Sequence, residues 1–125
     1  MWIIDSAVSD FDGTASFNVS TNGMSSSLNE LTDFSINNTK VRFENQINVD
    51  VVRMDTFIME NGIDVIDYFH CDTQGSDLDV LYGLGEKISI IKEGTIEAAA
   101  KQDILYKNQN TVMECVEFLK MNNFE

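Results

Sequence analysis

One stretch, Val65 to Leu84, constrains the fold of this 125-residue chain more than any other. It starts with a short apolar run rich in β-branched and aromatic residues, which is typical of a buried strand. Asp72-Thr73-Gln74-Gly75 then interrupts the run with turn-forming residues. Apolar residues recur at helical spacing after the turn, with Ser76 or Asp77 as the N-cap. The stretch therefore predicts a strand, a sharp turn and a helix.

Asp72 lies at the carboxyl end of this expected strand, beside the N-terminus of the expected helix. In open α/β sheets, ligands bind outside the carboxyl ends of the strands. Asp72 is therefore in the position of a site residue. An Asp at this place can equally serve only to cap the next turn, so the residues by themselves leave both roles open.

The second half of the chain alternates between expected strands and expected helices. A second buried strand over Ile88–Ile91, continuing toward Ile96, would pair with the first strand through a right-handed crossover. The clearest helix covers Thr111–Met121. This order predicts an α/β fold. The apolar face of that last helix is expected to hold Val112, Cys115, Val116 and Leu119.

The first half is expected to be mainly β-structure. Strands are predicted at Trp2–Ile4 and Ser16–Ser20, with an Asp-Gly turn at Asp10–Gly13 between them. An extended segment over Lys40–Val52 loses its alternation near Asn45–Gln46, which indicates a bulge or turn. The other expected elements are a polar loop over Thr21–Ser27, a short helix within Leu28–Asn38, a short helix capped by Asp55 and closed by Gly62, and a loop or short helix over Ala98–Tyr106.

Composition narrows the classes of partner. The chain carries 21 acidic and 8 basic residues, for a net charge of −13. Nucleic acids and anionic membrane surfaces both require basic footprints, so we expect neither as a partner. No run approaches the roughly 18 to 20 apolar residues that span a bilayer, and no signal peptide is visible. These features predict a cytoplasmic protein with an acidic, solvated surface.

The Cys and His residues do not predict a metal centre. Cys71 and Cys115 are the only cysteines and His70 is the only histidine, so no zinc-site spacing exists. Both cysteines fall on apolar faces, which favours free buried thiols over a disulfide. His70, in the strand, is either a hydrogen-bonded structural residue or a candidate base, since the unperturbed pKa of a histidine is about 6.5.

Four segments, in order, carry a resemblance to a known family. The central one is His70-Cys71-Asp72-Thr73-Gln74-Gly75-Ser76-Asp77-Leu78-Asp79-Val80-Leu81, preceded by Ile66-Asp67. The others are Ala7-Val8-Ser9-Asp10-Phe11-Asp12-Gly13, Ser25-Ser26-Ser27-Leu28 and Val51-Val52-Arg53-Met54-Asp55. Together they resemble the motifs of the FkbM family of S-adenosylmethionine-dependent methyltransferases, whose central motif has the form K-I-D-x-E-G-x-E-x-x-V-L.

The resemblance implies a fold and a reaction. The fold would be a partial Rossmann-like, class I methyltransferase sheet with flanking helices and a β-hairpin excursion. Residues 1–125 would form a single, truncated domain that starts at the third strand of the family's sheet. The reaction would be transfer of a methyl group from S-adenosylmethionine to a hydroxyl of a sugar or secondary metabolite, so the expected partner is a small-molecule or carbohydrate acceptor.

The resemblance also implies roles for individual residues. Asp72 would position the acceptor hydroxyl or act as general base, with His70 as the second catalytic candidate. Glu97, at the end of the next strand, and Gln74 would contact the substrate. His70 stands where the family usually has Lys, and Gln74 stands where it has Glu, which removes a charge at that position. The residues expected near the adenine edge of the cofactor are Ala7, Ser9 and Asp10.

One part of the expected cofactor site is missing from the sequence. Class I methyltransferases hold the cofactor with a Gly-rich turn between a strand and a helix, by the same logic as the dinucleotide fingerprint. Gly83-Leu84-Gly85 follows a helix and fails that test. Two alternatives therefore stay open: a non-catalytic α/β interaction module, or a nucleotide-binding domain of other chemistry. The chain could also act as a homodimer or with a partner chain that supplies the missing half.

Overall fold

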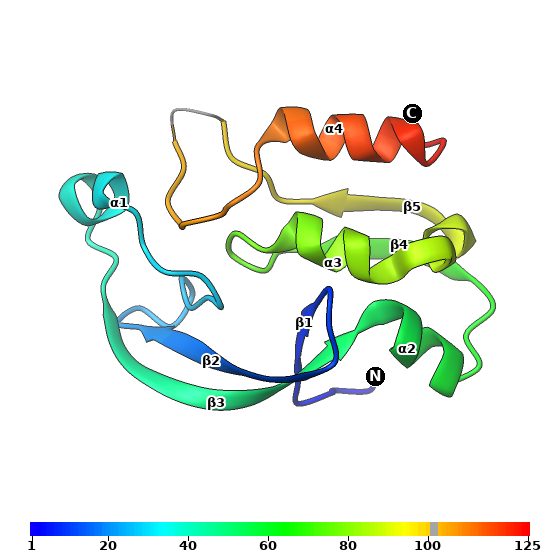
Figure 1. Ribbon diagram of the computed structural model, residues 1–125, viewed down its shortest axis with the longest axis horizontal. Coiled ribbons are helices and arrows are strands. Elements are labelled where there is room, and N and C mark those ends of the chain that lie inside the picture. The colour runs from blue at the N-terminus through cyan, green and yellow to red at the C-terminus, as the bar shows by residue number, and fades with distance from the viewer. Residues whose placement is uncertain (101–102) are drawn as a thin grey trace.

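The computed structural model describes residues 1–100 and 103–125. Its elements along the chain are β1 (Ala7–Ser9), β2 (Gly13–Ser20), α1 (Asp33–Asn38), β3 (Phe43–Arg53), α2 (Met54–Glu60), β4 (Ile66–Cys71), α3 (Asp77–Leu84), the 3-10 helix η1 (Gly85–Ile90), β5 (Ile91–Ile96) and α4 (Val112–Met121). In these residues the strands form two sheets, one in the order β1-β3-β2 and one of β4 and β5 (Figure 1). The predicted α/β class is confirmed, whereas a continuous Rossmann-like sheet stays an expectation.

The long strand β3 is the centre of the first sheet. Strand β2 pairs with it antiparallel and β1 pairs with it parallel, on the opposite edge. The register places Phe17 opposite Ile47 and then shifts between Val19 and Ser20. A bulge at this point confirms the break in alternation that the sequence predicts near Asn45–Gln46. The β2–β3 pair extends as a long curved ribbon (Figure 1).

One N-terminal prediction is wrong and another is confirmed in part. Trp2–Ile4 forms no strand, and Trp2 and Ile3 are 84% and 83% exposed, because no neighbouring strand in the described residues pairs with them. The turn at Asp10–Gly13 exists, but the strands on either side of it do not pair with each other as a hairpin. Both strands pair with β3 instead. The antiparallel partner of β2 is therefore the strand that follows α1 in the sequence.

The predicted strand-turn-helix unit at Val65–Leu84 is confirmed as β4, a turn and α3. Strands β4 and β5 are parallel, with Ile66 opposite Ile91 and Cys71 opposite Ile96. The second strand starts later than predicted. Gly85–Ile90 continues from α3 as a 3-10 helix, in which Ile88 is buried against the core. The apolar run at Ile88 therefore reflects burial in a helical turn, which periodicity alone does not distinguish from a strand.

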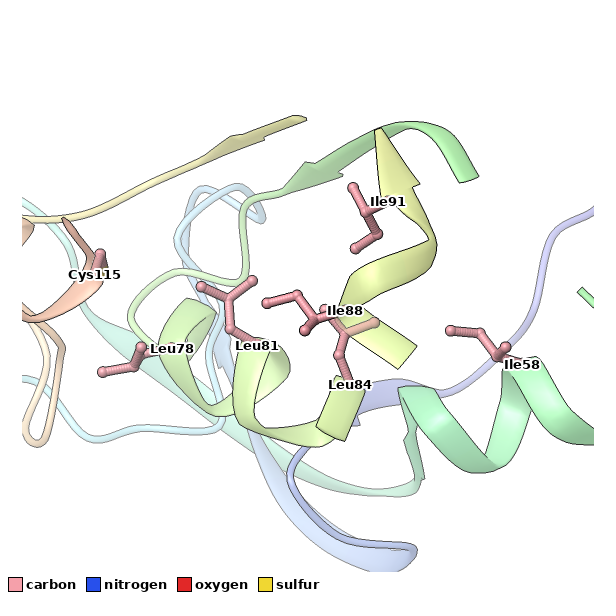
Figure 2. Packing of buried hydrophobic residues seen from close by; sticks show 7 residues of the cluster. All are labelled: Ile58, Leu78, Leu81, Leu84, Ile88, Ile91 and Cys115. Atoms are coloured by element: carbon pink, nitrogen blue, oxygen red, sulfur yellow. The ribbon is translucent and has the colours of Figure 1, made fainter. Parts of the chain in front are cut away.

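Helix α3 is the core of the molecule. Its leucines pack with residues from four other elements, and Figure 2 shows this cluster around the helix. Gly83 allows the helix to touch the other sheet directly: a Cβ there would lie 2.4 Å from the Ser9 carbonyl oxygen of β1. Each buried aliphatic side chain contributes about 1.5–3 kcal/mol. The cluster consists of Ile58, Leu78, Leu81, Leu84, Ile88, Ile91 and Cys115.

Helix α4 is confirmed, and Thr111 and Glu114 form a capping box at its start. Its buried face differs in part from the prediction. Cys115 is buried as expected, but Val112 and Val116 are 45% and 37% exposed. The helix is rotated so that Phe118 packs against the core, with its ring 5.0 Å from that of Tyr82.

Both cysteines are free and buried, as the sequence predicts. The predicted loop or short helix at Ala98–Tyr106 lies partly outside the described residues, because 101–102 are not among them. Within the described part of the chain, no helix has the length and apolar character needed to cross a membrane.

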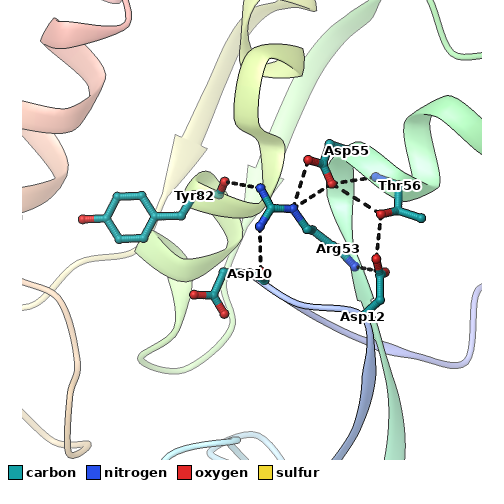
Figure 3. A network of polar contacts seen from close by, with 6 residues as sticks. All are labelled: Asp10, Asp12, Arg53, Asp55, Thr56 and Tyr82. Atoms are coloured by element: carbon teal, nitrogen blue, oxygen red, sulfur yellow. Dashed lines mark hydrogen bonds and ion pairs between the residues drawn. The ribbon is translucent and has the colours of Figure 1, made fainter.

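Arg53 joins three segments at the end of β3 (Figure 3). Its guanidinium donates to both carboxylate oxygens of Asp55, at 2.9 and 3.0 Å, and to the Asp10 and Tyr82 carbonyl oxygens. Its backbone N–H donates to Asp12, and this bond together with one from Thr56 lowers the pKa of the Asp12 carboxyl. Arg53 therefore links β1, α2 and the end of α3. Asp55, predicted as the N-cap of α2, instead lies in its first turn, after the cap residue Arg53.

We expect Arg53→Lys to lower the free energy of unfolding by about 1–3 kcal/mol, because the single ammonium group of lysine cannot replace the three guanidinium nitrogens that contact Asp55 and the two carbonyl oxygens. Urea denaturation measures the change. Lys92→Met is the matched control: it removes an exposed ion pair with Asp67 and should cost less than about 0.5 kcal/mol. Equal losses in the two variants would contradict the assigned role of Arg53.

Candidate active site at the ends of the parallel strands

The turn after β4 is organised by a buried carboxylate, that of Asp77. Asp77 is 1% exposed and accepts hydrogen bonds from the Thr73 backbone N–H and hydroxyl, at 3.3 and 3.0 Å. It also accepts one from the Glu97 backbone N–H, at 3.4 Å. The first residue of α3 thus ties together the carboxyl ends of β4 and β5, which positions Asp72 and Glu97 beside each other.

Asp72, Gln74 and Glu97 form a polar cluster at these strand ends. The Gln74 side-chain amide donates to Asp72 Oδ1 at 2.7 Å and to Glu97 Oε2 at 3.4 Å. Gln74 has a left-handed backbone conformation, with φ of 55°, and Gly75 follows with φ of 108°. Non-glycine residues seldom adopt such a conformation. This unusual turn is what directs the amide of Gln74 toward the two carboxyl groups.

The two carboxyl groups are coupled. Partial desolvation of its carboxyl, a hydrogen bond with Asp72 and the negative charges of Asp72 and Asp77 raise the pKa of Glu97 to about 7, although the residue remains exposed at the surface. Because the neighbouring negative charges disfavour ionisation of Glu97, its carboxyl keeps the proton to a higher pH than an isolated glutamate does. Groups with such perturbed pKa values occur often at functional sites.

The cluster borders a cleft of about 510 Å³ between the two sheets. The cleft brings together residues from β1, β2, the following loop and the turn after β4, and its walls are largely apolar. Its lining residues are Ser6, Ala7, Val8, Phe17, Val19, Gly23, Met24, Ser26, Leu28, Asp72, Thr73 and Gln74. Of the residues expected from the sequence to form the site, Ala7, Asp72 and Gln74 line this cleft, and Glu97 joins them through Gln74.

The other three expected site residues lie elsewhere. Ser9 and Asp10 border a smaller neighbouring pocket of about 240 Å³, together with Asp79 of α3. Burial and the charge of Asp10 raise the pKa of the Asp79 carboxyl. His70 is exposed on β4, where its Nδ1 lies 2.8 Å from the Thr95 hydroxyl. It is not among the residues that line the cleft, and its catalytic role stays a prediction.

Tyr106 is the main site residue that sequence reasoning missed. It is buried, and its hydroxyl lies 3.0 Å from Gln74 Oε1 and 3.1 Å from the Ser25 carbonyl oxygen. It is 32 residues from Gln74 in the chain. No motif or periodicity surrounds it, so only the tertiary structure could place it here. Ser27, at the end of the predicted polar loop, donates to the Gln74 carbonyl oxygen at 2.6 Å.

These features, two neighbouring carboxyl groups at the ends of parallel strands beside a cleft, describe an α/β protein with a candidate ligand-binding site at the position where open α/β sheets bind their ligands. Comparison with protein-family models finds a match to the methyltransferase FkbM domain over residues 3–125. The chain therefore belongs to the FkbM methyltransferase family, as its motifs predict. Searches of curated proteins and of solved structures return no match.

The raised pKa of Glu97 predicts a pH-dependent stability. The folded state holds the Glu97 proton up to a higher pH than the unfolded state does, so stability should fall as pH rises from about 4.5 to about 7. Glu97→Gln should remove much of this decline and stabilise the protein at pH 8 by on the order of 1 kcal/mol, since solvent screens the effect. Urea denaturation across pH measures it. Glu93→Gln, on the exposed part of β5, is the matched control and should leave the pH dependence unchanged. An unchanged slope in Glu97→Gln would contradict the coupling.

Proposed function

We propose that this chain carries the acceptor side of an S-adenosylmethionine-dependent O-methyltransferase. The observation that supports this most directly is the Asp72–Gln74–Glu97 cluster beside the cleft, at the carboxyl ends of two parallel strands. Methyl transfer to a hydroxyl requires an oriented acceptor and a base that removes its proton. The cluster offers both functions within one hydrogen-bonded group.

Glu97 is the stronger candidate for the base, although the family resemblance implies only substrate contact for it. With a pKa of about 7 it can accept a proton at neutral pH, near the optimum for general-base catalysis. Asp72 orients the acceptor hydroxyl, while Gln74 holds Asp72 and Glu97 together. Ala7 and Met24 belong to the apolar wall that limits water around the acceptor.

S-adenosylmethionine, when bound, supplies an activated methyl group on a positively charged sulfur, and nearby carboxylates suit that charge. The fit of this chain to the cofactor is partial. The acidic cluster matches the sulfonium end. In residues 1–100 and 103–125, however, no Gly-rich turn joins a strand to a helix, and such a turn would be needed to hold the methionine part. We infer that a partner chain of different sequence completes the cofactor site.

The acceptor we propose is a small molecule or a carbohydrate with a free hydroxyl. The cleft combines apolar walls with an acidic end, which favours a neutral or cationic acceptor over an anionic one. The net charge of −13 likewise disfavours a nucleic acid as the acceptor, because its phosphates would be repelled. The two free buried thiols agree with the reducing conditions of the cytoplasm, where we place the protein.

A second function, that of a non-catalytic interaction module, is favoured by one observation. Strand β5 pairs with β4 on one edge only, as far as the described residues show, and its other edge lies open. Open strand edges readily pair with another chain. The same edge would serve a partner that completes the enzyme, so only an activity measurement separates the two functions.

We expect the purified chain by itself not to bind S-adenosylmethionine with micromolar affinity, because the described residues hold only part of the cofactor site. Isothermal titration calorimetry with S-adenosylmethionine measures this, with the chain checked to be monomeric at the concentration used. Saturable binding in the micromolar range by the monomer would contradict the inference that the cofactor site is incomplete.

We expect methyl transfer when the chain is produced together with the products of the adjoining DNA, including any in-frame upstream sequence. Radiolabelled S-adenosylmethionine and a panel of hydroxylated sugars and metabolites provide the assay. Glu97→Gln and Asp72→Asn should each lower kcat/KM by about 10²- to 10⁴-fold. In the wild type, kcat/KM should rise with pH through about 7 as Glu97 loses its proton.

The matched control for this assay is Glu93→Gln, which makes the same chemical change within β5, outside the carboxyl cluster and the cleft, and should retain wild-type activity. Transfer that persists undiminished in both Glu97→Gln and Asp72→Asn would contradict the proposed site. If no transfer occurs with any acceptor in the co-produced sample, the interaction module becomes the better interpretation.

A further inference from the structure

Tyr106 reaches the carboxyl cluster from a distant part of the chain. It lies between β5 and α4, is 2% exposed, and directs its hydroxyl at Gln74 Oε1, 3.0 Å away. None of the motifs that carry the family resemblance includes it. The hydroxyl donates to the Gln74 amide, which in turn contacts both carboxyl groups. Tyr106 can therefore influence the position of the carboxyl groups without contacting a substrate.

The orientation of the Gln74 amide decides what the cluster can do. Its NH₂ end donates to Asp72 Oδ1 at 2.7 Å and to Glu97 Oε2 at 3.4 Å, and these bonds offset the repulsion between the two carboxyl groups. If the amide turned over, its oxygen would face two acidic groups instead. A donor on the oxygen side is what fixes the productive orientation, and Tyr106 is placed there.

We propose that Tyr106 is a positioning residue for the Asp72–Glu97 pair and acts through Gln74. The proposal rests on the function proposed above for that pair. One hydroxyl hydrogen is shared between Gln74 and the Ser25 carbonyl oxygen, at 3.1 Å, so Tyr106 also ties the loop beside the cleft to the carboxyl cluster.

The ring and backbone of Tyr106 are held independently of its hydroxyl. The ring packs on Gly75, where an added Cβ would lie 3.0–3.2 Å from the tyrosine side chain. Its backbone N–H donates to Gln109 Oε1 at 3.2 Å. Removing only the hydroxyl should therefore leave the ring in place. The Gln74 amide then loses its donor and can rotate.

The test is an NMR titration of the Glu97 side-chain carboxyl carbon in the full chain, with ¹³C-labelled glutamate and the resonance assigned by Glu97→Gln. In Tyr106→Phe the titration midpoint should rise by about half a pH unit, because the charged carboxyl loses the fixed N–H donor. Tyr82→Phe is the matched control. The Tyr82 ring packs on Phe118, and its hydroxyl makes no hydrogen bond to the described residues, so the midpoint should not move.

A second variant, Gln74→Asn, tests whether Tyr106 acts on the carboxyl groups through the Gln74 side chain. Asn tolerates a left-handed backbone, so the turn can persist, but its shorter side chain cannot bridge Tyr106 and the carboxyl groups. It should raise the midpoint as Tyr106→Phe does, and the double variant should show no further rise. An unchanged midpoint in a folded Tyr106→Phe overturns the proposal. If Tyr106→Phe does not fold, an unchanged midpoint in Gln74→Asn overturns it.

Additive shifts in the double variant would also overturn the route through Gln74. The titration needs neither cofactor nor acceptor, so it can fail while methyl transfer is observed, or succeed while no acceptor is found. Failure of the positioning role is thereby distinguished from failure of the proposed function.

Discussion

Gly83 lets α3 lie directly against β1, because a Cβ added at this position would be 2.4 Å from the Ser9 carbonyl oxygen. Any side chain at that position would push the helix away from the first sheet. The cleft lies between residues of β1 and the turn that precedes α3, so its width depends on this approach. The buried leucines of α3 then hold the second sheet on the other side of the helix. The site is thus built by the packing of one helix.

Neutral hydrogen-bond donors stabilise the carboxyl groups of the site. Asp77 is buried with three donor contacts from the ends of β4 and β5, and Gln74 supplies an N–H group to each of the other two carboxyl groups. A buried carboxylate without such partners would be costly. This chain has Gln74 where the family usually has Glu. The structure gives a physical reason for the difference, because an acid at this position would put a third carboxyl group beside Asp72 and Glu97.

Sequence reasoning succeeded where a local pattern had one structural meaning. The strand-turn-helix unit around Asp72, the bulge near Asn45 and the last helix are all confirmed. It failed where an apolar run has several meanings. Trp2–Ile4 was predicted as a strand and is exposed, whereas the strand predicted at Ile88 is a 3-10 turn whose isoleucine enters the core. An apolar run by itself does not show whether the segment is a strand, a helical turn or an exposed irregular segment.

The sequence by itself determined the family and the α/β class, and it pointed to Asp72 as a candidate site residue, because short motifs and turn chemistry depend on neighbours along the chain. Only the tertiary structure decided which residues gather around Asp72. It brought Glu97 beside Asp72, placed Tyr106 behind Gln74, and set Ser9 and Asp10 in a neighbouring pocket. These contacts join residues more than 20 positions apart, and the packing of α3 between the sheets creates them.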